Sequence, residues 1–248
     1  MIKLTKKGAP TQLTQNFIDQ GKIDFSADKK SRPWAKDWIR SALKDESNNK
    51  CSYCEQSLGE RGLYLEVEHF YVKSVYEDKI LDWNNLLASC KTCNLKKSTL
   101  DVGKEPIINP FFDEPKSHLK INRYRYEAKT DLGEVTILSL DLNNYDSLSK
   151  NRFALCYAIQ DQIKALVQRV QDIGANVPST RVVLNIRNKA TTILQNAQPD
   201  HAFSASVATE IIGTAEFIPI KEFLEANGEW NQILSDLYDS AKDIAMLD

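Results

Sequence analysis

Apolar residues in the second half of the chain recur every three or four positions, which is the period of an α-helix. The longest stripe runs from Phe153 to Ile173 and ends at Gly174, a residue type that commonly terminates helices. Shorter stripes follow toward the end of the chain. We therefore predict a helical C-terminal half, with helices over residues 153–173, 180–195, 207–212, 220–226 and 230–244.

The first fifty residues predict shorter helices. Residues 13–20 form one helical pattern, which Gly21 is expected to end. Trp34, Trp38 and Ala42 recur at helical spacing, so a second helix should pack its indoles against the segment that follows. A tryptophan stacked on a nucleic-acid base is the alternative interpretation.

The middle of the chain has the two-residue period of a β-strand. Residues 62–69 alternate apolar and polar side chains, so Glu66 and Glu68 should share one face of a strand that ends at His69. A loop follows, and Asn94 to Lys97 is expected to open a short helix. Strand, loop and helix would then bring polar side chains into one small cleft.

Between the middle and the helical half lies a segment rich in turn residues. Residues 105–115 contain three prolines and indicate an extended connector. Residues 121–127 and 134–138 flank Asp131-Leu132-Gly133 and predict a β-hairpin. The first of these strands alternates arginine and tyrosine from Arg123 to Tyr126. This alternation could bind nucleic acid, but we prefer a half-buried strand whose arginines extend their charged ends to solvent.

Four cysteines form two CxxC pairs, Cys51/Cys54 and Cys90/Cys93. Two such turns can complete a tetrahedral thiolate site with no position left for water, so we predict a structural zinc ion. Free buried cysteines rarely fall into this spacing, and a disulfide framework would need an oxidising compartment. The fifth cysteine, Cys156, lies in an apolar helical pattern and is expected to be an inert buried thiol.

The charge is close to balanced and unevenly distributed. The 248-residue chain has a net charge of −2, with 11 basic against 6 acidic residues in positions 1–50 and a net acidic remainder. Free-standing nucleic-acid binders commonly carry a basic surface, so a phosphate grip outside the central site is expected near the N-terminus. No apolar run approaches the length of a membrane span, and we expect a cytoplasmic protein.

The central residues resemble those of the ββα-metal (HNH) nucleases. That family has an acidic residue followed by His, an Asn before Leu, and a final His or Asn; here these are Glu68-His69, Asn85-Leu86 and Asn94, set between the CxxC pairs. Two positions depart from the family pattern. Glu68 stands where Asp is commoner, and Val72 stands where many members have Pro.

The resemblance implies a role for each of these residues. Glu68 and Asn94 would hold one catalytic divalent ion, and His69 would be the general base. Asn85 would brace the loop that orients His69, although it could also cap a turn. The candidate phosphate contacts are Lys73, Lys96 and Lys97.

The implied chemistry also follows from the residue types. Hydrolysis of a phosphodiester needs a base that deprotonates water, and a neutral imidazole with a pKa near ~6.5 can do so at cellular pH. A bound cation stabilises the charge that develops on phosphate oxygens. Carboxylate and amide oxygens suit Mg²⁺ or Mn²⁺, so the expected reaction is single-metal hydrolysis by water.

The organisation of the whole chain resembles a narrower group. An HNH cassette followed by an acidic helical half is similar to the PtuB-type and retron-associated HNH endonucleases of Septu and retron anti-phage systems. This resemblance implies an ABC-type ATPase partner (PtuA-like) that docks on the C-terminal half, and, for retrons, a reverse transcriptase with its RNA and DNA. The implied substrate is nucleic acid, either DNA or RNA.

The expected fold is α+β and mostly helical, with a zinc-stabilised ββα-metal module between helical segments. Residues 1–50 would be the helical lead-in, 51–112 the HNH module, and 113–248 a hairpin with the helical, partner-docking domain. Metal-dependent endonuclease is the preferred function. A non-catalytic zinc module that binds nucleic acid or protein, and a helical scaffold with an architectural zinc site, are the alternatives.

Overall fold

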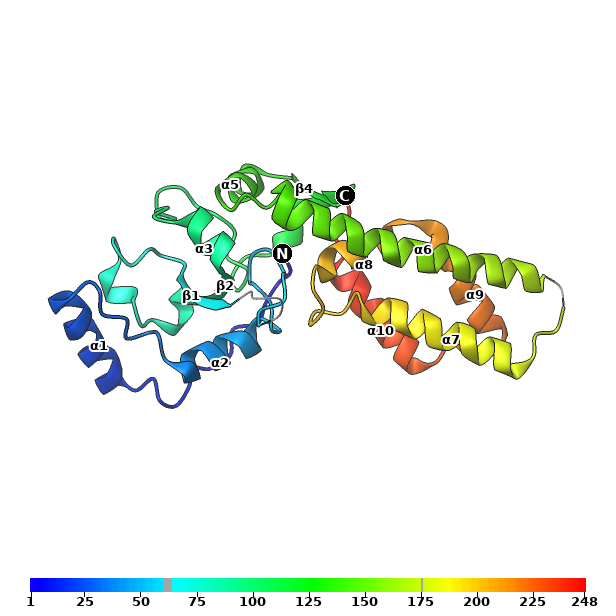
Figure 1. Ribbon diagram of the computed structural model, residues 1–248, viewed down its shortest axis with the longest axis horizontal. Coiled ribbons are helices and arrows are strands. Elements are labelled where there is room, and N and C mark those ends of the chain that lie inside the picture. Colours follow the sequence, from blue (N-terminus) through cyan, green and yellow to red (C-terminus); the bar gives the residue numbers. More distant parts are fainter. Residues whose placement is uncertain (60–63, 175) are drawn as a thin grey trace. The chain divides into compact units, whose positions relative to one another are not determined.

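A computed structural model describes residues 1–59, 64–174 and 176–248 of the chain. It contains two compact units, one made of Met1–His118 and Glu127–Leu142 and the other of Leu119–Tyr126 and Asn143–Asp248. Helices predominate, and the described strands form two small two-stranded sheets. The predicted α+β, mostly helical class is therefore confirmed (Figure 1).

The first unit begins with helix α1, Gln15–Ala27, whose first turn is capped by Thr14. The prediction that Gly21 ends this helix was wrong, because the helix continues through it. Gly21 is buried, and a Cβ atom there would lie 2.5 Å from the Leu81 side chain and 3.0 Å from Pro33. This glycine therefore permits close packing of α1 and is not a stop signal.

Helix α2, Asp37–Glu46, forms where helical spacing predicted it, but Trp34 precedes its first turn. The helix buries Ile39 and Leu43, whereas the Trp38 indole meets the Phe17 ring of α1 edge to face at 5.3 Å. The Trp34 indole is buried and meets the His69 ring at 4.6 Å. Trp34 therefore packs against the segment that follows, as predicted, whereas Trp38 packs against the helix that precedes it.

A two-stranded sheet and a short helix follow. Strand β1, Leu65–His69, pairs antiparallel with β2, Leu86–Cys90, so that Leu65 faces Cys90 and His69 faces Leu86. Two 3-10 turns, Glu77–Lys79 and Trp83–Asn85, interrupt the loop between them, and α3, Lys91–Lys97, begins directly after β2. The predicted strand is confirmed from residue 65; its first two residues, 62 and 63, lie outside the described part of the chain.

The predicted hairpin around Asp131 was wrong. That segment is helix α5, Asp131–Ser139, because the Thr130 hydroxyl caps its first turn by accepting the Gly133 amide. The hairpin lies earlier and consists of β3, Leu119–Asn122, and β4, Arg125–Ala128, directly after the short helix α4, Pro115–His118. Its turn places Arg123 and Tyr124 at φ 47° and 67°, a conformation that their side chains do not signal.

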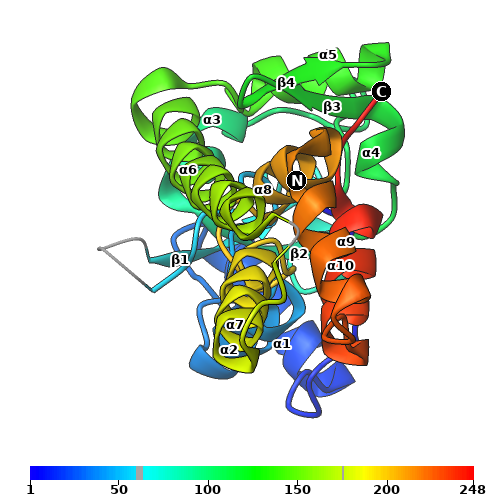
Figure 2. The ribbon, with the colours of Figure 1, turned by 90° about the vertical axis from the view of Figure 1, so that its right-hand side faces the viewer.

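The second unit is a helical bundle. Helices α6 and α7 lie side by side, and α8, α9 and α10 complete the bundle (Figures 1 and 2). The predicted helices are confirmed with small shifts at their ends: α6 Lys150–Ile173, α7 Thr180–Gln195, α8 Ser204–Gly213, α9 Ile218–Ala226 and α10 Gln232–Ile244. Short turns at Tyr145–Ser149 and Ala215–Phe217 precede α6 and α9.

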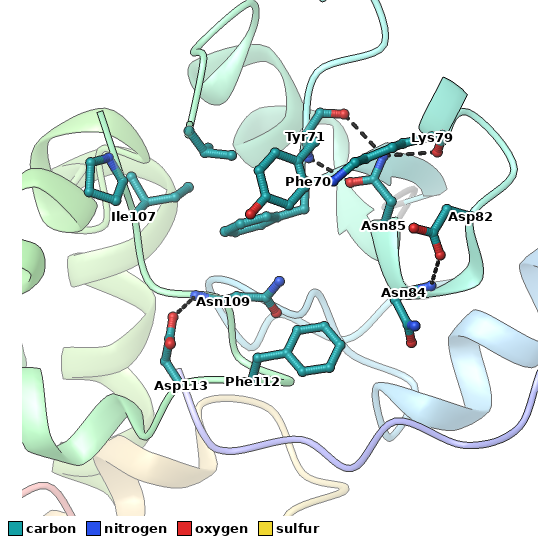
Figure 3. A pocket seen from close by; sticks show the side chains of 12 residues that line it. Phe70, Tyr71, Lys79, Asp82, Asn84, Asn85, Ile107, Asn109, Phe112 and Asp113 are labelled. Atoms are coloured by element: carbon teal, nitrogen blue, oxygen red, sulfur yellow. Dashed lines mark hydrogen bonds between the residues drawn. The ribbon is translucent and has the colours of Figure 1, made fainter. Parts of the chain in front are cut away.

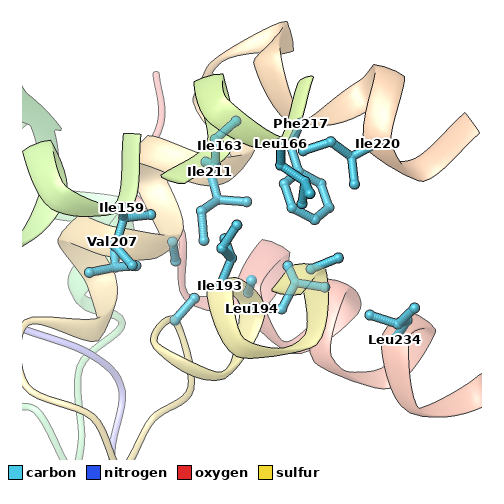
Figure 4. Close-up of a cluster of buried hydrophobic side chains, with 14 of the residues drawn as sticks. Ile159, Ile163, Leu166, Ile193, Leu194, Val207, Ile211, Phe217, Ile220 and Leu234 are labelled. Atoms are coloured by element: carbon cyan, nitrogen blue, oxygen red, sulfur yellow. The ribbon is translucent and has the colours of Figure 1, made fainter. Parts of the chain in front are cut away.

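The bundle core is made of the inward stripes that the sequence predicted. Ile163, Ile186 and Phe217 are among the buried side chains that meet there (Figure 4). Cys156 is also fully buried in this core, and burial raises the pKa of its thiol to about 12, as expected for an inert thiol. Phe153 and Ile233 were expected in the stripes but are exposed.

None of the helices in the described residues combines the length and the apolar character that crossing a bilayer requires.

Candidate active site and metal centre

The four CxxC cysteines meet at one point of the first unit. Cys51 and Cys54 lie on a turn after α2, Cys90 ends β2, and Cys93 lies in the first turn of α3. All four are buried, and their sulfur atoms lie within 4.8 Å of one another. A backbone hydrogen bond of 2.9 Å from Ser52 to Ala88 also ties the first turn to β2.

The geometry of these thiols fits a zinc ion. Four sulfurs at about 2.3 Å from one ion form a tetrahedron with edges of about 3.8 Å. The sulfurs of Cys54 and Cys90 are 3.8 Å apart. Hydrogen bonds with Cys51 raise the pKa of Cys54 and Cys93 well above the usual thiol value, so four thiolates at this spacing need a cation to ionise together.

His69 ends β1 and is held from two sides. The Trp34 indole meets its ring edge to face at 4.6 Å, and its Nε2 lies 3.0 Å from the Ile80 carbonyl oxygen. Because a carbonyl oxygen only accepts, Nε2 carries the proton of the neutral ring. Nδ1 therefore keeps the lone pair that a base needs.

The imidazole is neutral by virtue of its surroundings. His69 is 4% exposed, and this burial lowers the pKa of its ring to about 3. The hydrogen bond with Ile80 opposes the shift, whereas the charges of Lys73 and Lys97 add to it. The ring is thus unprotonated across the physiological range, but it is a weaker base than the imidazole with a pKa near ~6.5 that the sequence led us to expect.

Asn85 closes the loop that carries Ile80. Its side-chain oxygen accepts the Tyr71 amide at 2.6 Å, and its side-chain nitrogen donates to the carbonyls of Tyr71 and Lys79, each at 3.0 Å. Its backbone carbonyl accepts the Phe70 amide at 2.9 Å. Through these four bonds Asn85 joins the two ends of the loop and so fixes the position of the Ile80 carbonyl under His69.

Glu68 is paired with a lysine inside the module. Its carboxylate lies 2.7 Å from the Lys97 ammonium, which also donates to the His69 carbonyl at 2.9 Å. Burial raises the pKa of Glu68, and the charge of Lys97 opposes that shift. With its side chain 1% exposed, Lys97 fastens α3 to the end of β1 and does not reach the surface.

Asn94 contacts Glu66 and not Glu68. The Asn94 side-chain nitrogen lies 2.5 Å from a Glu66 carboxylate oxygen. From the sequence we expected Glu66 to be solvated. The alternation that places Glu66 and Glu68 on one face of the strand was the signal that could have included Glu66 in the site. Turning the Asn94 amide would direct its oxygen to the same place, so Asn94 and Glu66 could together present oxygen atoms to a hard divalent cation.

The three candidate phosphate contacts have different surroundings. Lys73 is half-buried, and its ammonium lies 5.6 Å from the centre of a Trp34 ring. Lys96 is exposed and paired with Asp141 at 2.8 Å. Lys97 is buried with Glu68. Lys73 and Lys96 are therefore at least partly open to solvent, whereas Lys97 is enclosed.

A thiolate cluster, an antiparallel strand pair and a helix around a neutral histidine define the class of this module. The family model described as HNH endonuclease matches residues 51–100, which include the four cysteines and the other predicted site residues but not Trp34. The chain therefore carries an HNH endonuclease domain.

Whole-chain comparison narrows the assignment. The chain is 36% identical over 239 residues to a Septu protein PtuB of Bacillus thuringiensis, which covers 93% of this chain and 90% of that protein. A Septu protein PtuB of Bacillus mycoides is 28% identical over 163 residues, covering 48% and 54% of the two chains. The chain belongs to the PtuB family of Septu proteins.

The four-thiol geometry predicts that one cysteine substitution removes the ion. In Cys54→Ala the zinc content should fall from about one to near zero per chain, because a structural site depends on all four thiolates. Elemental analysis of the purified protein measures this. Cys156→Ala, which removes a buried thiol from the helical bundle, should keep its zinc; full zinc in Cys54→Ala would contradict the assignment of the cluster.

The buried pair predicts a large difference between two adjacent lysines. Lys97→Met should lower the free energy of unfolding by about 3–5 kcal/mol, because it leaves the Glu68 carboxylate buried without a partner. Lys96→Met should cost less than about 1 kcal/mol, because its ion pair is exposed. Urea unfolding of the zinc-loaded proteins measures both, and equal losses would contradict the internal role of Lys97.

Proposed function

We propose that this chain is a metal-dependent endonuclease that hydrolyses phosphodiester bonds of nucleic acid and serves as the nuclease of a Septu-type anti-phage defence system. The observation that carries the proposal is the orientation of His69. Its Nε2 proton is committed to the Ile80 carbonyl, which leaves Nδ1 as a neutral base at the end of a strand beside Glu68. The HNH match and the PtuB relatives support the same reaction class.

In the proposed reaction His69 takes a proton from a water molecule at Nδ1. The water oxygen forms a bond to phosphorus as the bond from phosphorus to the 3′ oxygen breaks, and solvent protonates the leaving oxygen. Bound Mg²⁺ or Mn²⁺ supplies stabilisation of the charge on the phosphate oxygens. The ligands that would hold this ion are the Asn94 amide with the carboxylates of Glu68 and Glu66, and Asn85 keeps the imidazole oriented by holding its loop.

Two lysines are proposed as phosphate contacts. Lys73 follows the histidine on the loop that Asn85 closes, and Lys96 is exposed on α3. Each could place an ammonium beside a substrate phosphate as a point charge. Lys97 has a positioning role in this proposal, because its ammonium already bridges Glu68 and the His69 carbonyl.

We further propose that an ABC-type ATPase partner docks on the C-terminal helical bundle. Net charge is −2, and residues outside the N-terminal fifty are acidic overall, so the chain alone has little surface to attract a polyanion. A partner that delivers or gates the substrate would overcome this deficit. The isolated chain should accordingly cut poorly.

A second candidate function is a zinc module that binds nucleic acid or protein without cleaving it. Burial favours it, since His69 is only 4% exposed and Glu68 is neutralised by Lys97. The two candidates differ in what they require of His69. Binding alone would tolerate its replacement, whereas hydrolysis would not.

The deciding experiment incubates phage DNA and total cellular RNA with Mg²⁺ and the zinc-loaded protein, alone and with the proteins that copurify from its operon. His69→Ala should lower cleavage by at least about 100-fold, the contribution typical of a general base. His201→Ala, which changes an exposed histidine of the bundle, is the matched control and should cut normally. Cleavage retained in His69→Ala would contradict the nuclease proposal, and robust cutting by the lone chain would contradict the need for a partner.

The burial of His69 also predicts the pH dependence. A base whose pKa is about 3 stays unprotonated well below neutrality, so kcat/KM should not lose activity to His69 protonation between about pH 8.5 and about pH 5. The measurement is a pH profile of cleavage, with zinc content checked at each end. The prediction is contradicted if the activity of the parent protein falls below about pH 6.5 and the residual activity of His69→Ala does not. That result would show that the His69 ring has the pKa of an exposed imidazole.

A further inference from the structure

The first unit contains a pocket that Asn85 helps to line and that has no assigned ligand in the proposed hydrolysis. It has a volume of about 430 Å³ and lies beside the loop that Asn85 closes (Figure 3). Its walls come from that loop and from the proline-rich connector of residues 105–115. The volume lies in the range that binds small planar ligands.

The walls are aromatic on opposite sides. Phe70 and Tyr71 line one side, and Phe112 lines the other with its ring 56% exposed. Tyr71 already contacts the Lys79 ammonium, which lies 4.0 Å from its ring centre, and it meets Phe70 edge to face at 5.5 Å. Phe112 therefore offers the free ring face on which another planar group could stack.

A buried amide points into this space. Asn109 is 6% exposed, its side-chain oxygen accepts the Phe111 amide at 3.0 Å, and its backbone amide donates to Asp113 at 2.7 Å. Its side-chain nitrogen lies between Phe112 and the rings of Phe70 and Tyr71 (Figure 3). Because Asn109 lines the pocket, this N–H donor can bind an acceptor atom of a ligand there.

The charges of the lining exclude a phosphate. Asp82 and Asp113 outnumber the one cation, Lys79, whose ammonium is turned onto Tyr71. A neutral planar ring that carries both acceptors and N–H donors is complementary to the Asn109 nitrogen and the nearby carboxylates. Among the components of nucleic acid, only the bases have this chemistry.

We propose that this pocket binds an unpaired nucleobase, stacked on Phe112 and hydrogen-bonded by Asn109. The position of this base relative to the cleaved phosphate rests on the proposed nuclease function. Phe70 and Tyr71 directly follow His69, and two residues span at most about 7 Å. Because nucleotides of one strand are about 3.4 Å apart along a duplex, the bound base lies within a few nucleotides of the cleaved phosphate.

The pocket would make the substrate depend on strand structure. A base held in a duplex is stacked and paired, so it must leave the helix before it can enter. A single strand, a bulge or a frayed end presents its bases at lower cost. The chain should therefore bind single-stranded or bulged nucleic acid more tightly than a perfect duplex of the same sequence.

The test measures binding by fluorescence anisotropy, with full-length zinc-loaded protein and its copurifying partner, in a His69→Ala background. The probes are a labelled single strand, the matching duplex, and single strands with one abasic site at successive positions. Removing the base at one position near the cut should weaken binding about tenfold, the effect expected for a lost stacking contact. Phe112→Ala should weaken binding of the intact single strand by the same factor. In that variant the abasic site should cause no further loss of affinity.

Two further variants separate binding from folding. Asn109→Asp keeps the oxygen that accepts the Phe111 amide but replaces the N–H donor, so it should weaken binding while zinc content and melting temperature stay normal. Tyr145→Ala removes an exposed aromatic ring of the other unit and should bind like the parent. Equal binding by Phe112→Ala and the parent would overturn the proposal.

The source of the base and the fate of the nuclease proposal are tested separately. Free nucleosides compete as a second arm; if one binds as tightly as the strand and abasic sites have no effect, the pocket serves a small molecule and the strand proposal fails. Loss of a copurifying protein in Phe112→Ala with unchanged nucleic-acid binding would likewise overturn it. Cleavage by the chain with intact His69 is measured in parallel, so the pocket can fail while the nuclease assignment stands.

Discussion

The four-cysteine cluster is the constraint on which the rest of the first unit depends. It joins the turn after α2 to the junction of β2 and α3, and β1 pairs with β2 and packs against α2 and α3. A two-stranded sheet is marginal in water without further support. A zinc ion at these thiols would supply that support and would fix the position of His69 relative to the loop that carries Ile80.

Within this frame, burial is what determines the chemistry. The same exclusion of water lowers the pKa of His69 and raises that of Glu68. Lys97 of α3 pairs with the Glu68 carboxylate and donates to the backbone carbonyl of His69. The His69 and Glu68 side chains are consecutive on β1 but have different partners: His69 contacts Trp34 and the Ile80 carbonyl, and Glu68 pairs with Lys97 of α3. The lowered pKa keeps His69 unprotonated at neutral pH, and it also makes the imidazole a weaker base than one in water.

The sequence predicted features that depend on neighbouring residues and missed those that depend on contacts between distant segments. The CxxC spacing and the helical stripe of 180–195 are local, and both were predicted correctly. The contact between Glu66 and Asn94 and the inward turn of Lys97 depend on how α3 crosses β1, which no local pattern shows. The hairpin at Arg123 was missed because its turn lacks the glycine or asparagine that usually marks such a conformation.

The central claim is that the cysteine cluster holds the site residues in place. Hydrogen exchange of the zinc-loaded and chelator-treated chain tests it most directly, because amide protection reports local stability along the whole sequence. The account predicts that chelation removes protection from β1, β2 and α3 while the bundle of α6 to α10 stays protected. Unchanged protection of β1 and β2 after the metal is gone would contradict it.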